Sequence, residues 1–285
     1  MTEYRKIDLH EWHQTGAGAN SISYVNEDET LLLKTFKGNV TLEVALRDIE
    51  MAQKVASLGL ATAEVYEVVD VNGRPGVIYQ NLKGKKSYSR LIADSPEKLT
   101  EYAKEFAAKA KELHSVPCNT ELFDSKVEMI RKGVKASKFI DKYKPSLYEL
   151  LDQMSEHTTC LHGDLQTGNL VKANGQDYWI DFDKFAYGDP IMDIAHMYTM
   201  YSSLAWFPYI QNLAHMNKKM LNQFWVDFVG EYFGIAPAEV KEFNKKLEIY
   251  NALDLVQRSY LRPGFIADAV SLILVKPKLK NYFKL

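Results

Sequence analysis

Apolar residues in the first part of the chain recur mainly at the spacing of β-strands. Short β-type runs fall at 22–25, 31–36, 64–71 and 74–80. The run at 31–36 has consecutive apolar residues, which predicts a strand buried on both faces. Asn72-Gly73 separates the last two runs and predicts a tight hairpin, because both turn positions favour positive φ. One segment, 41–58, has helical periodicity and stops before Gly59, which predicts an amphipathic helix.

A basic, Gly-containing stretch at 83–87 predicts a boundary between an N-terminal lobe, 1–82, and a C-terminal lobe, 83–285. Helical patterns dominate beyond it, at 95–113, 124–140, 145–154 and from 190 to the end. Ser95 is expected to cap the first of these helices. Bulky core candidates of the last segment are Trp225, Phe228, Tyr232 and Phe233. Short strands and loops interrupt the helices near 158–183. The pattern therefore predicts an α+β fold, with an antiparallel sheet and one helix followed by a mostly helical part.

Composition and charge narrow the class of protein. The formal net charge is −2 and no long basic run occurs, so nucleic acid is not an expected partner. The two cysteines, Cys118 and Cys160, lie far apart and have no metal-binding spacing, which favours a reduced, cytoplasmic protein. The first residues contain no signal-peptide pattern. The apolar run at 265–275 is too short to cross a bilayer, so no membrane association is expected.

The strongest candidate for chemistry is the stretch from Cys160 to Leu170. His162-Gly163-Asp164 is followed by Asn169, the spacing of a base and a metal ligand in the general kinase template. A simple turn is the alternative, since Asp and Asn often cap their own backbones. Asp181, which follows a predicted hairpin at 174–175, favours a phosphoryl-transfer site, because Mg²⁺ binds one or two protein oxygens together with phosphate and water.

These motifs also carry a family resemblance. They are His162-Gly163-Asp164 with Asn169-Leu170, Trp179 to Asp183, Gly188-Asp189-Pro190 and Asp193-Ile194-Ala195. Together they resemble the aminoglycoside phosphotransferase and choline kinase superfamily, small-molecule kinases with a two-lobed, protein-kinase-like fold. The resemblance covers 160–197 closely, the N-terminal lobe loosely, and not the last eighty or so residues. It implies that Asp164 is the catalytic base and that Asn169 and Asp181 bind Mg²⁺.

The resemblance assigns further residues. It places the hinge that pairs with the adenine of ATP at Gln80-Asn81-Leu82, so that Gln80 and Leu82 are predicted to bind the nucleotide. Asp193 matches an acid that braces the catalytic loop. His114 ends a long helix and is expected to be packed and hydrogen-bonded rather than catalytic.

Lys34 is a separate candidate, because a lysine on an apolar strand is costly unless its ammonium is paired or reaches a cleft. The kinase template places such a lysine on the nucleotide phosphates, held by an acid of the next helix. A surface lysine with a buried stem is the alternative. Asp48 flanks the buried face of that helix and is our choice of partner, although the family usually has Glu there. Glu50 has the length of Glu but is expected to face solvent with Lys54.

Two weaker signals remain. Residues 14–21 are predicted to form a Gly-containing turn, in which Gly16, Gly18 and Ser21 would bring backbone amides to the phosphates; a plain hairpin is the alternative. Asp181 and Asp183 are expected to share a strand face, where Asp183 could bind a second metal, although a solvated or Lys184-paired acid is favoured.

The sequence points to a small-molecule acceptor. Only twelve positions separate Asp181 from Asp193, too few for a regulated activation segment. We expect Mg-ATP-dependent transfer to a hydroxyl of an aminoglycoside-like, choline-like or sugar-like molecule. The alternatives are an atypical protein serine/threonine kinase and a non-catalytic nucleotide-binding module.

The acceptor itself is poorly determined by the sequence. Residues 211–285 contain eleven Lys and Arg against seven Asp and Glu, which disfavours a polycationic aminoglycoside. Five aromatic residues could form a cage for a quaternary ammonium group, although core packing is expected for at least half of them. They are Tyr198, Tyr201, Trp206, Phe207 and Tyr209.

Overall fold

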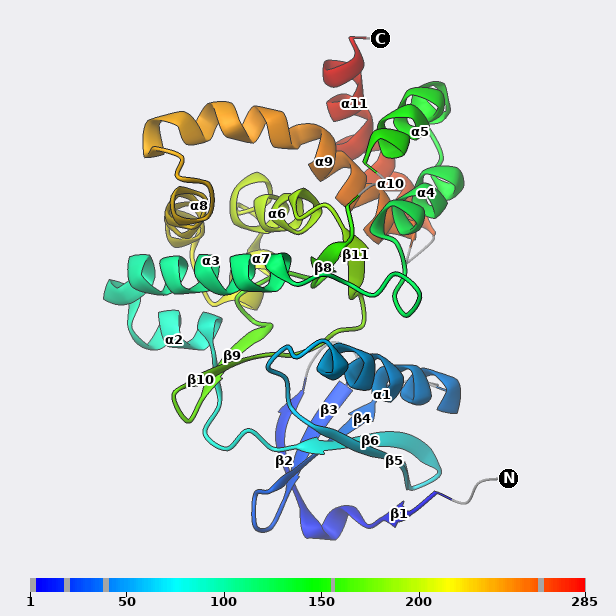
Figure 1. The fold of residues 1–285 in the computed structure, drawn as a ribbon, viewed down its shortest axis with the longest axis vertical. Coiled ribbons are helices and arrows are strands. Elements are labelled where there is room, and N and C mark those ends of the chain that lie inside the picture. The colour runs from blue at the N-terminus through cyan, green and yellow to red at the C-terminus, as the bar shows by residue number, and fades with distance from the viewer. Residues whose placement is uncertain (1–3, 18–20, 38–40, 155–156, 261–263, 285) are drawn as a thin grey trace. The chain divides into compact units, whose positions relative to one another are not determined.

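The computed structural model describes residues 4–17, 21–37, 41–154, 157–260 and 264–284, shown in Figure 1. The chain divides into two compact units. The first contains Met1–Ser87 and Asn169–Asp183, and the second contains Tyr88–Gly168 and Lys184–Leu285. The predicted catalytic stretch is therefore divided, with Asp164 in the second unit and both predicted metal ligands in the first.

A six-stranded sheet forms most of the first unit (Figure 1). Its order is β1-β5-β6-β4-β3-β2, and all neighbours are antiparallel except β1 and β5. The strands are β1 Lys6–Ile7, β2 Trp12–Ala17, β3 Ser21–Asn26, β4 Leu31–Phe36, β5 Val65–Val71 and β6 Arg74–Gln80, with a short 3₁₀ helix, η1 Leu9–Glu11. The predicted strands and their order are confirmed. The turn predicted over 14–21 is wrong for Gln14–Ala17, because these residues pair with β3 as part of β2.

Helix α1, Leu42–Ser57, packs on β5 and β6 and confirms the predicted helix. Its buried residues, Ala45, Ala52 and Val55, recur at helical spacing. The helix ends where Gly59 adopts a φ of 77°, a left-handed conformation in which glycine has no Cβ penalty. The Gly59 amide donates to the Ala56 carbonyl at 3.0 Å.

The two predicted hairpins are confirmed. At the tip of β5–β6, Asn72 and Gly73 have φ of 53° and 79°. Asn174 and Gly175, with φ of 50° and 77°, join β9 Leu170–Ala173 to β10 Gln176–Trp179. With β7 Lys86–Ser87 these strands form a small sheet in the order β10-β9-β7. This sheet holds Asn169 and the segment after Trp179 within the first unit.

Strand β4 is less buried than predicted. Leu33 is fully buried with Val69 and Ile78, which contributes about 1.5–3 kcal/mol to folding. The expectation of burial on both faces is wrong, because Leu32 and Lys34 line a pocket on the other side of the strand. The open face of β4 therefore carries side chains that a ligand in the pocket can contact.

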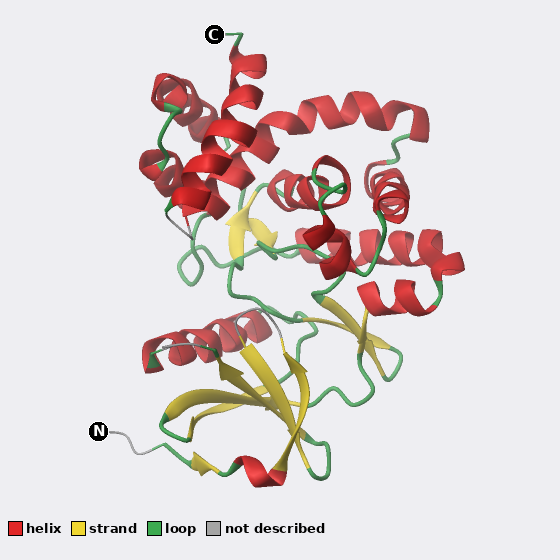
Figure 2. Cartoon of the chain, turned by 180° about the vertical axis from the view of Figure 1, so that it is seen from behind, coloured by secondary structure: helices red, strands yellow, loops and turns green. Residues whose placement is uncertain are grey.

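The second unit is mostly helical, as Figure 2 shows, with one two-stranded antiparallel sheet of β8 Thr159–Leu161 and β11 Ala186–Gly188. Its α-helices are α2 Tyr88–Asp94, α3 Leu99–Ser115, α4 Lys126–Ala136, α5 Lys144–Gln153, α6 Ile191–Tyr198, α7 Pro208–Ala214, α8 Lys218–Phe233, α9 Val240–Tyr260, α10 Phe265–Val270 and α11 Lys276–Phe283. Shorter helical turns are η2 Pro96–Lys98, η3 Asp141–Tyr143, η4 Thr199–Ser203, η5 Pro237–Glu239 and η6 Ser271–Val275.

The predicted helices of this unit exist, but two of their ends differ. Ser95 does not cap α3, because η2 lies between them, and its side chain makes no capping bond at the start of η2. The helix predicted to reach residue 140 ends at Ala136, before Phe139 adopts a left-handed φ of 67°. The α4 start is capped by Ser125, whose hydroxyl accepts from the Glu128 amide at 3.4 Å.

Aromatic residues of α3 and α8 form one centre of the helical core. Phe106 packs against Phe224 and Phe228, with ring centroids 5.9 and 6.0 Å apart. Trp225 is also buried, as predicted, whereas Phe233 is 41% exposed because it lies at the end of α8. Over the described ranges, no helix has the length and apolar content needed to cross a membrane.

Candidate active site

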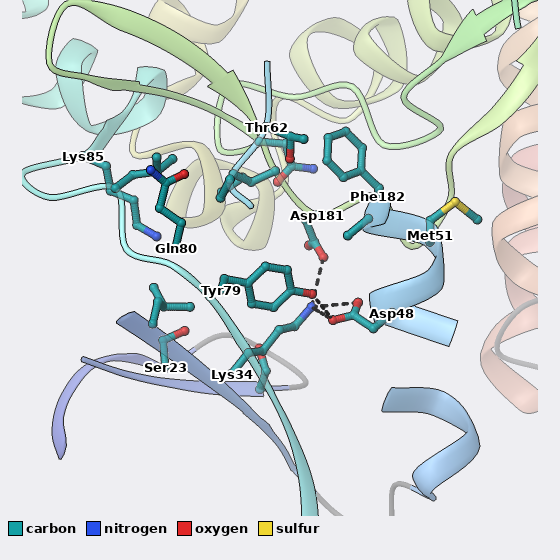
Figure 3. A pocket seen from close by; sticks show the side chains of 17 residues that line it. Ser23, Lys34, Asp48, Met51, Thr62, Tyr79, Gln80, Lys85, Asp181 and Phe182 are labelled. Carbon is teal, nitrogen blue, oxygen red and sulfur yellow. Dashed lines mark hydrogen bonds and ion pairs between the residues drawn. The ribbon is translucent and has the colours of Figure 1, made fainter. Parts of the chain in front are cut away.

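A pocket in the first unit gathers most of the predicted nucleotide-binding residues, as Figure 3 shows. Its walls come from β3, β4 and β6, from α1, and from the segment after β10. Leu32 and Leu82 are among its apolar side chains, whereas Lys34, Asp48 and Asp181 contribute charge. The cavity has a volume of about 210 Å³.

Lys34 and Asp48 form the ion pair that was expected. The Lys34 Nζ lies 3.2 Å from both carboxylate oxygens of Asp48. Glu50 is not its partner, because Glu50 pairs with Lys54 on the exposed side of α1. The Tyr79 hydroxyl donates to Asp48 Oδ2 at 2.5 Å, so the carboxylate is held from two directions (Figure 3). The role of the pair toward a nucleotide stays a prediction.

The neighbouring carboxylates shift the pKa values of Lys34 and Tyr79 in the direction that keeps both side chains protonated. Burial would lower the pKa of Lys34, but Asp48 and Asp181 outweigh burial and raise the pKa above its ordinary value. Burial and the neighbouring Asp48 carboxylate raise the pKa of Tyr79 far above its usual range. Lys34 therefore stays cationic and Tyr79 stays a hydrogen-bond donor near neutral pH.

Asp181 and Asn169 line the same pocket. Asp181 Oδ1 lies 3.8 Å from Lys34 Nζ, and its side chain is 52% exposed. The Ile180 amide donates to the Asn169 carbonyl at 3.0 Å, which ties together the two segments that carry the predicted metal ligands. Asp181 has a φ of 67°, a conformation that non-glycine residues adopt mainly in turns and at functional sites. An amide and a carboxylate oxygen on one wall fit Mg²⁺, which takes few protein ligands in phosphate sites.

The predicted hinge also lies at this pocket. The amides of Gln80 and Asn81 are taken by the carbonyls of Glu64 and Thr30, both at 2.8 Å. Within the described part of the chain, the Leu82 amide donates to no protein acceptor, while the Leu82 carbonyl accepts from Lys85. A base that enters the pocket can therefore use the Leu82 N–H.

The glycine-containing segment is only partly described. Gly18 lies outside the described residues, and Gly16 lies in β2 with no positive φ. Ser21 lines the pocket at the start of β3. The expectation that Asp181 and Asp183 share a strand face is wrong, because β10 ends at Trp179.

Asp164, in the second unit, is surrounded by three basic side chains. Lys184 Nζ donates to Asp164 Oδ2 at 2.7 Å. His196 Nε2 and Arg258 Nη1 lie 3.0 and 3.2 Å from Asp164 Oδ1. Lys184, considered from the sequence as a partner for Asp183, thus contacts the predicted base. Both neighbours of Oδ1 come from helices, His196 from α6 and Arg258 from α9.

These contacts determine the protonation of Asp164. Burial would raise the pKa of Asp164, but contact with His196 and the charges of Arg258 and Lys184 outweigh burial and hold the pKa far below its ordinary range. The carboxylate is therefore ionised and is a weak proton acceptor. Such a group can orient a hydroxyl by accepting its hydrogen bond, and can take the proton only late in the transfer.

Asp193 makes the contacts expected of a loop brace. Its carboxylate accepts from the His162 amide at 2.7 Å and from the Gly163 amide at 2.9 Å. His114 Nε2 lies 3.2 Å from the same carboxylate, and His114 Nδ1 lies 2.7 Å from the Tyr232 hydroxyl. His114 is thus buried and hydrogen-bonded, as predicted.

The five aromatic residues do not form one cage. Tyr201 is buried, and its hydroxyl donates to or accepts from Thr167 Oγ1 at 2.7 Å. Tyr198 is also buried and bonds Glu248. The other three are 45–59% exposed, so the expectation of core packing for at least half of the set is wrong. They are Trp206, Phe207 and Tyr209.

Sequence reasoning missed Tyr79, His196, Asp254 and Arg258. The sequence contains a signal for His196 and one for the pair of Asp254 and Arg258. His196 follows Asp193 by three positions on α6, and Arg258 follows Asp254 by four on α9, so each pair shares a helix face. No pattern indicated that these faces meet the catalytic loop.

Comparisons with known proteins agree with the site. The APH family model, described as the phosphotransferase enzyme family, matches residues 13–223. The Protein LicA homolog of Mycoplasma capricolum subsp. capricolum (strain California kid) is 22% identical over 183 residues, which are 63% of this chain and 69% of that protein.

Solved structures resemble the whole chain. A thermostable mutant of the aminoglycoside phosphotransferase APH(4)-Ia has a TM-score of 0.61 at 15% identity, covering 95% of this chain and 94% of its own. The amicoumacin kinase hAmiN, in complex with AMP-PNP, Ca²⁺ and Ami, has a TM-score of 0.57 at 15% identity, covering 98% and 90%. A choline/ethanolamine kinase family protein from Mesorhizobium loti has a TM-score of 0.53 at 14% identity, covering 96% and 85%. At these identities the likeness establishes the fold, which is α+β and protein-kinase-like, as predicted. Because the family model spans more than half of the chain, the protein belongs to the phosphotransferase enzyme family, as the motifs around Asp164 and Asp181 indicated.

Proposed function

We propose that this protein transfers the γ-phosphoryl group of ATP to a hydroxyl group of a small molecule, with Mg²⁺ as its metal. The observation that carries the proposal is the pocket of the first unit, where Lys34, Asp48, Asn169 and Asp181 line one cavity. A strand lysine held by a helical acid, beside an Asn and an Asp, is the set that the kinase template uses on the phosphates and metal of a nucleotide.

Each residue has a role in this proposal. Lys34, fixed by Asp48, neutralises phosphate charge, and Asn169 and Asp181 hold Mg²⁺. The Leu82 amide donates to the adenine ring, with Gln80 beside it at the hinge. Mg²⁺, when bound, offsets the negative charge that the phosphates carry. The backbone near Gly16, Gly18 and Ser21 is proposed to cover the phosphates.

Asp164 is the proposed catalytic residue. Its low pKa supports a role in which the carboxylate accepts a hydrogen bond from the acceptor hydroxyl and so aligns it for attack. Because phosphoryl transfer proceeds through a loose transition state, alignment and charge neutralisation contribute more than strong basicity. Asp183 has no role in the proposal.

The short segment after Asp181 supports a small-molecule acceptor. Strand β11 begins at Ala186 and α6 at Ile191, so only four residues, 182–185, lie between Asp181 and the next strand, which leaves no room for a long activation segment. An atypical protein serine/threonine kinase is therefore the second candidate. The similar structures include complexes with streptomycin, with kanamycin and of an amicoumacin kinase with Ami, and complexes with ADP and GDP, which supports a nucleotide donor and a small-molecule acceptor without selecting one.

The test is release of ADP from Mg-ATP in the presence of a pooled metabolite library, with GTP assayed in parallel. Asp164→Ala is expected to lower turnover by at least about 100-fold while nucleotide affinity, measured by calorimetry, stays unchanged. The matched control is Asp152→Ala, because Asp152 lies on α5 with a side chain that is 70% exposed, and it contacts Arg131 at the surface. Wild-type turnover by Asp164→Ala refutes the assignment. Incorporation of phosphate into proteins but into no metabolite favours the protein-kinase alternative.

A further inference from the structure

Lys85 lines the pocket of the first unit but has no role in the proposed transfer. It lies directly after the hinge, where the Lys85 amide donates to the Leu82 carbonyl at 3.0 Å and closes a turn. Lys34, the other lysine that lines this pocket, belongs to β4. The pocket is therefore lined by two lysines that come from different segments of the chain.

The ammonium groups of these two lysines differ in their partners. Lys34 Nζ lies 3.2 Å from Asp48 and 3.8 Å from Asp181. Among the residues that the structure describes, Lys85 Nζ has no hydrogen-bond acceptor and no ion-pair partner. A lysine ammonium has three donors and no acceptor. Lys85 therefore has donors available for a ligand, whereas the charge of Lys34 is already balanced by protein carboxylates.

Lys85 also lies away from the charged group around Lys34. In Figure 3 it is on the side of the pocket that holds Gln80, and the dashed contacts are on the side that holds Asp48. Although Lys85 is exposed, the surrounding protein lowers its pKa below the ordinary value, and no charged neighbour contributes to that shift. The pKa of Lys34, in contrast, is raised by Asp48 and Asp181. Lys85 is therefore too far from these carboxylates to interact with them.

The position of Lys85 indicates which part of a nucleotide it can reach. In the proposed function the phosphates lie near Lys34 and the metal ligands, and the base lies at the Leu82 amide. Lys85 is three residues beyond Leu82 and is joined to it by the turn, so its ammonium belongs to the base end of the pocket. Ring nitrogens of a base and hydroxyl oxygens of a ribose both accept hydrogen bonds, which is the chemistry that a donor-only ammonium needs.

We propose that Lys85 is a nucleoside-binding residue, whose ammonium donates to an acceptor atom of the base or of the ribose and not to the phosphates. The inference rests on the proposed function, because it assigns to Lys85 a contact with the nucleotide donor. It adds a cationic contact at the end of the pocket where the hinge provides a backbone amide.

The experiment measures binding of Mg-ATP and of adenosine to the full chain by calorimetry. Lys85→Met keeps an unbranched apolar stem and removes the ammonium. Because the lost hydrogen bond is charged but partly exposed, both ligands should bind about 3- to 10-fold more weakly, by the same factor. The matched control is Lys83→Met, since Lys83 lies in the same segment and its Nζ is 3.1 Å from a carboxylate oxygen of Glu29. The control should bind both ligands as the wild type does.

Two analogues, 2′-deoxy-ATP and 3′-deoxy-ATP, distinguish the ribose from the base. If Lys85 bonds a ribose oxygen, one analogue binds the wild type more weakly and binds wild type and Lys85→Met equally. If Lys85 bonds the base, both analogues lose the same factor as ATP in Lys85→Met. Either result supports a nucleoside contact.

A second variant separates binding from folding. Lys85→Gln keeps a neutral donor and should bind ATP and adenosine with intermediate affinity. Thermal unfolding of both variants should match the wild type, because neither substitution leaves a protein group unpaired.

Three results overturn the inference. They are wild-type affinity in both Lys85 variants, a loss for ATP without a loss for adenosine, and an equal loss in Lys83→Met. Binding of ATP by the wild type without measurable binding of adenosine also overturns it. If the wild type binds neither ligand, the proposed function fails and the inference fails with it. If Asp164→Ala abolishes turnover while the Lys85 variants bind normally, only this inference fails.

Discussion

Among the described glycines, Gly163 would place an added Cβ nearest to the backbone of another segment, so replacing it with alanine tests the geometry of the loop around Asp164. Gly163 has a φ of 76°, and a Cβ there would lie 1.8 Å from the Lys184 carbonyl oxygen and 2.5 Å from its carbon. Real Cβ contacts stay beyond 3.0 Å, so the Lys184 carbonyl must move by at least 3.0 − 1.8 = 1.2 Å. Both groups are backbone, and no side-chain rotation relieves the overlap.

The cost has two parts. A non-glycine residue in the left-handed region costs about 1–2 kcal/mol. Forcing extra volume into a packed site costs about 1–3 kcal/mol more. We therefore expect Gly163→Ala to lower the free energy of unfolding by about 2–5 kcal/mol, from the sum of these ranges. Because the Gly163 amide donates to Asp193 and its carbonyl accepts from Arg258, kcat should also fall.

The matched control is Gly168→Ala in the same loop. Its added Cβ would meet nothing closer than 3.7 Å, which is ordinary van der Waals contact. Its unfolding free energy should therefore change by about 0.5 kcal/mol or less. Urea unfolding followed by fluorescence and circular dichroism measures both variants, since two probes reveal any departure from two-state behaviour. Equal stability of the two alanine variants would refute the close approach of Gly163 to Lys184.

Two further predictions concern other buried groups. Tyr79→Phe removes the hydroxyl donor to Asp48 and should weaken Mg-ATP binding about tenfold, as measured by calorimetry; an unchanged Kd would show that Lys34 alone holds Asp48. Burial lowers the pKa of Lys126 from 10.5 to about 8, so between these values the unfolded chain binds a proton that the folded chain does not. The free energy of unfolding should then rise by about 1 kcal/mol per pH unit above pH 8, and Lys126→Met should lack this rise in urea titrations at pH 8 and 9. Parallel pH dependences of the wild type and Lys126→Met would contradict the burial of a charged lysine.

Local patterns predicted most of the secondary structure, because the relevant physics acts over a few residues. The Asn-Gly turns at 72–73 and 174–175 and the helix stop at Gly59 each depend on backbone conformations that only certain residues adopt readily. The wrong predictions concern segments whose structure depends on more than the local sequence pattern. The second face of β4 lines a pocket, and the helix after Ser125 ends at Ala136 because the backbone becomes extended at Ser137.

Some residues of the candidate site could also be predicted from the sequence, whereas others could not. The motifs around Asp164, Asn169 and Asp181 are visible in the sequence because short loops hold them at fixed spacing. Helical phase, together with the distance ahead of Gly59, favours Asp48 over Glu50. The roles of these residues remain predictions. Tyr79 was not found, since a tyrosine at the end of an apolar strand looks like an ordinary core residue.

By itself, the sequence determined the element order, the phosphotransferase motifs and the family, because these depend on residue type and spacing along the chain. Only the tertiary structure decided which distant side chains meet: Tyr79 on Asp48, Lys184 on Asp164, and His196 and Arg258 on Asp164 Oδ1. Such contacts join residues up to 94 positions apart. The contacts of His196 and Arg258 come from helices α6 and α9, whose packing brings basic side chains to a buried loop without leaving a periodic signal in the sequence.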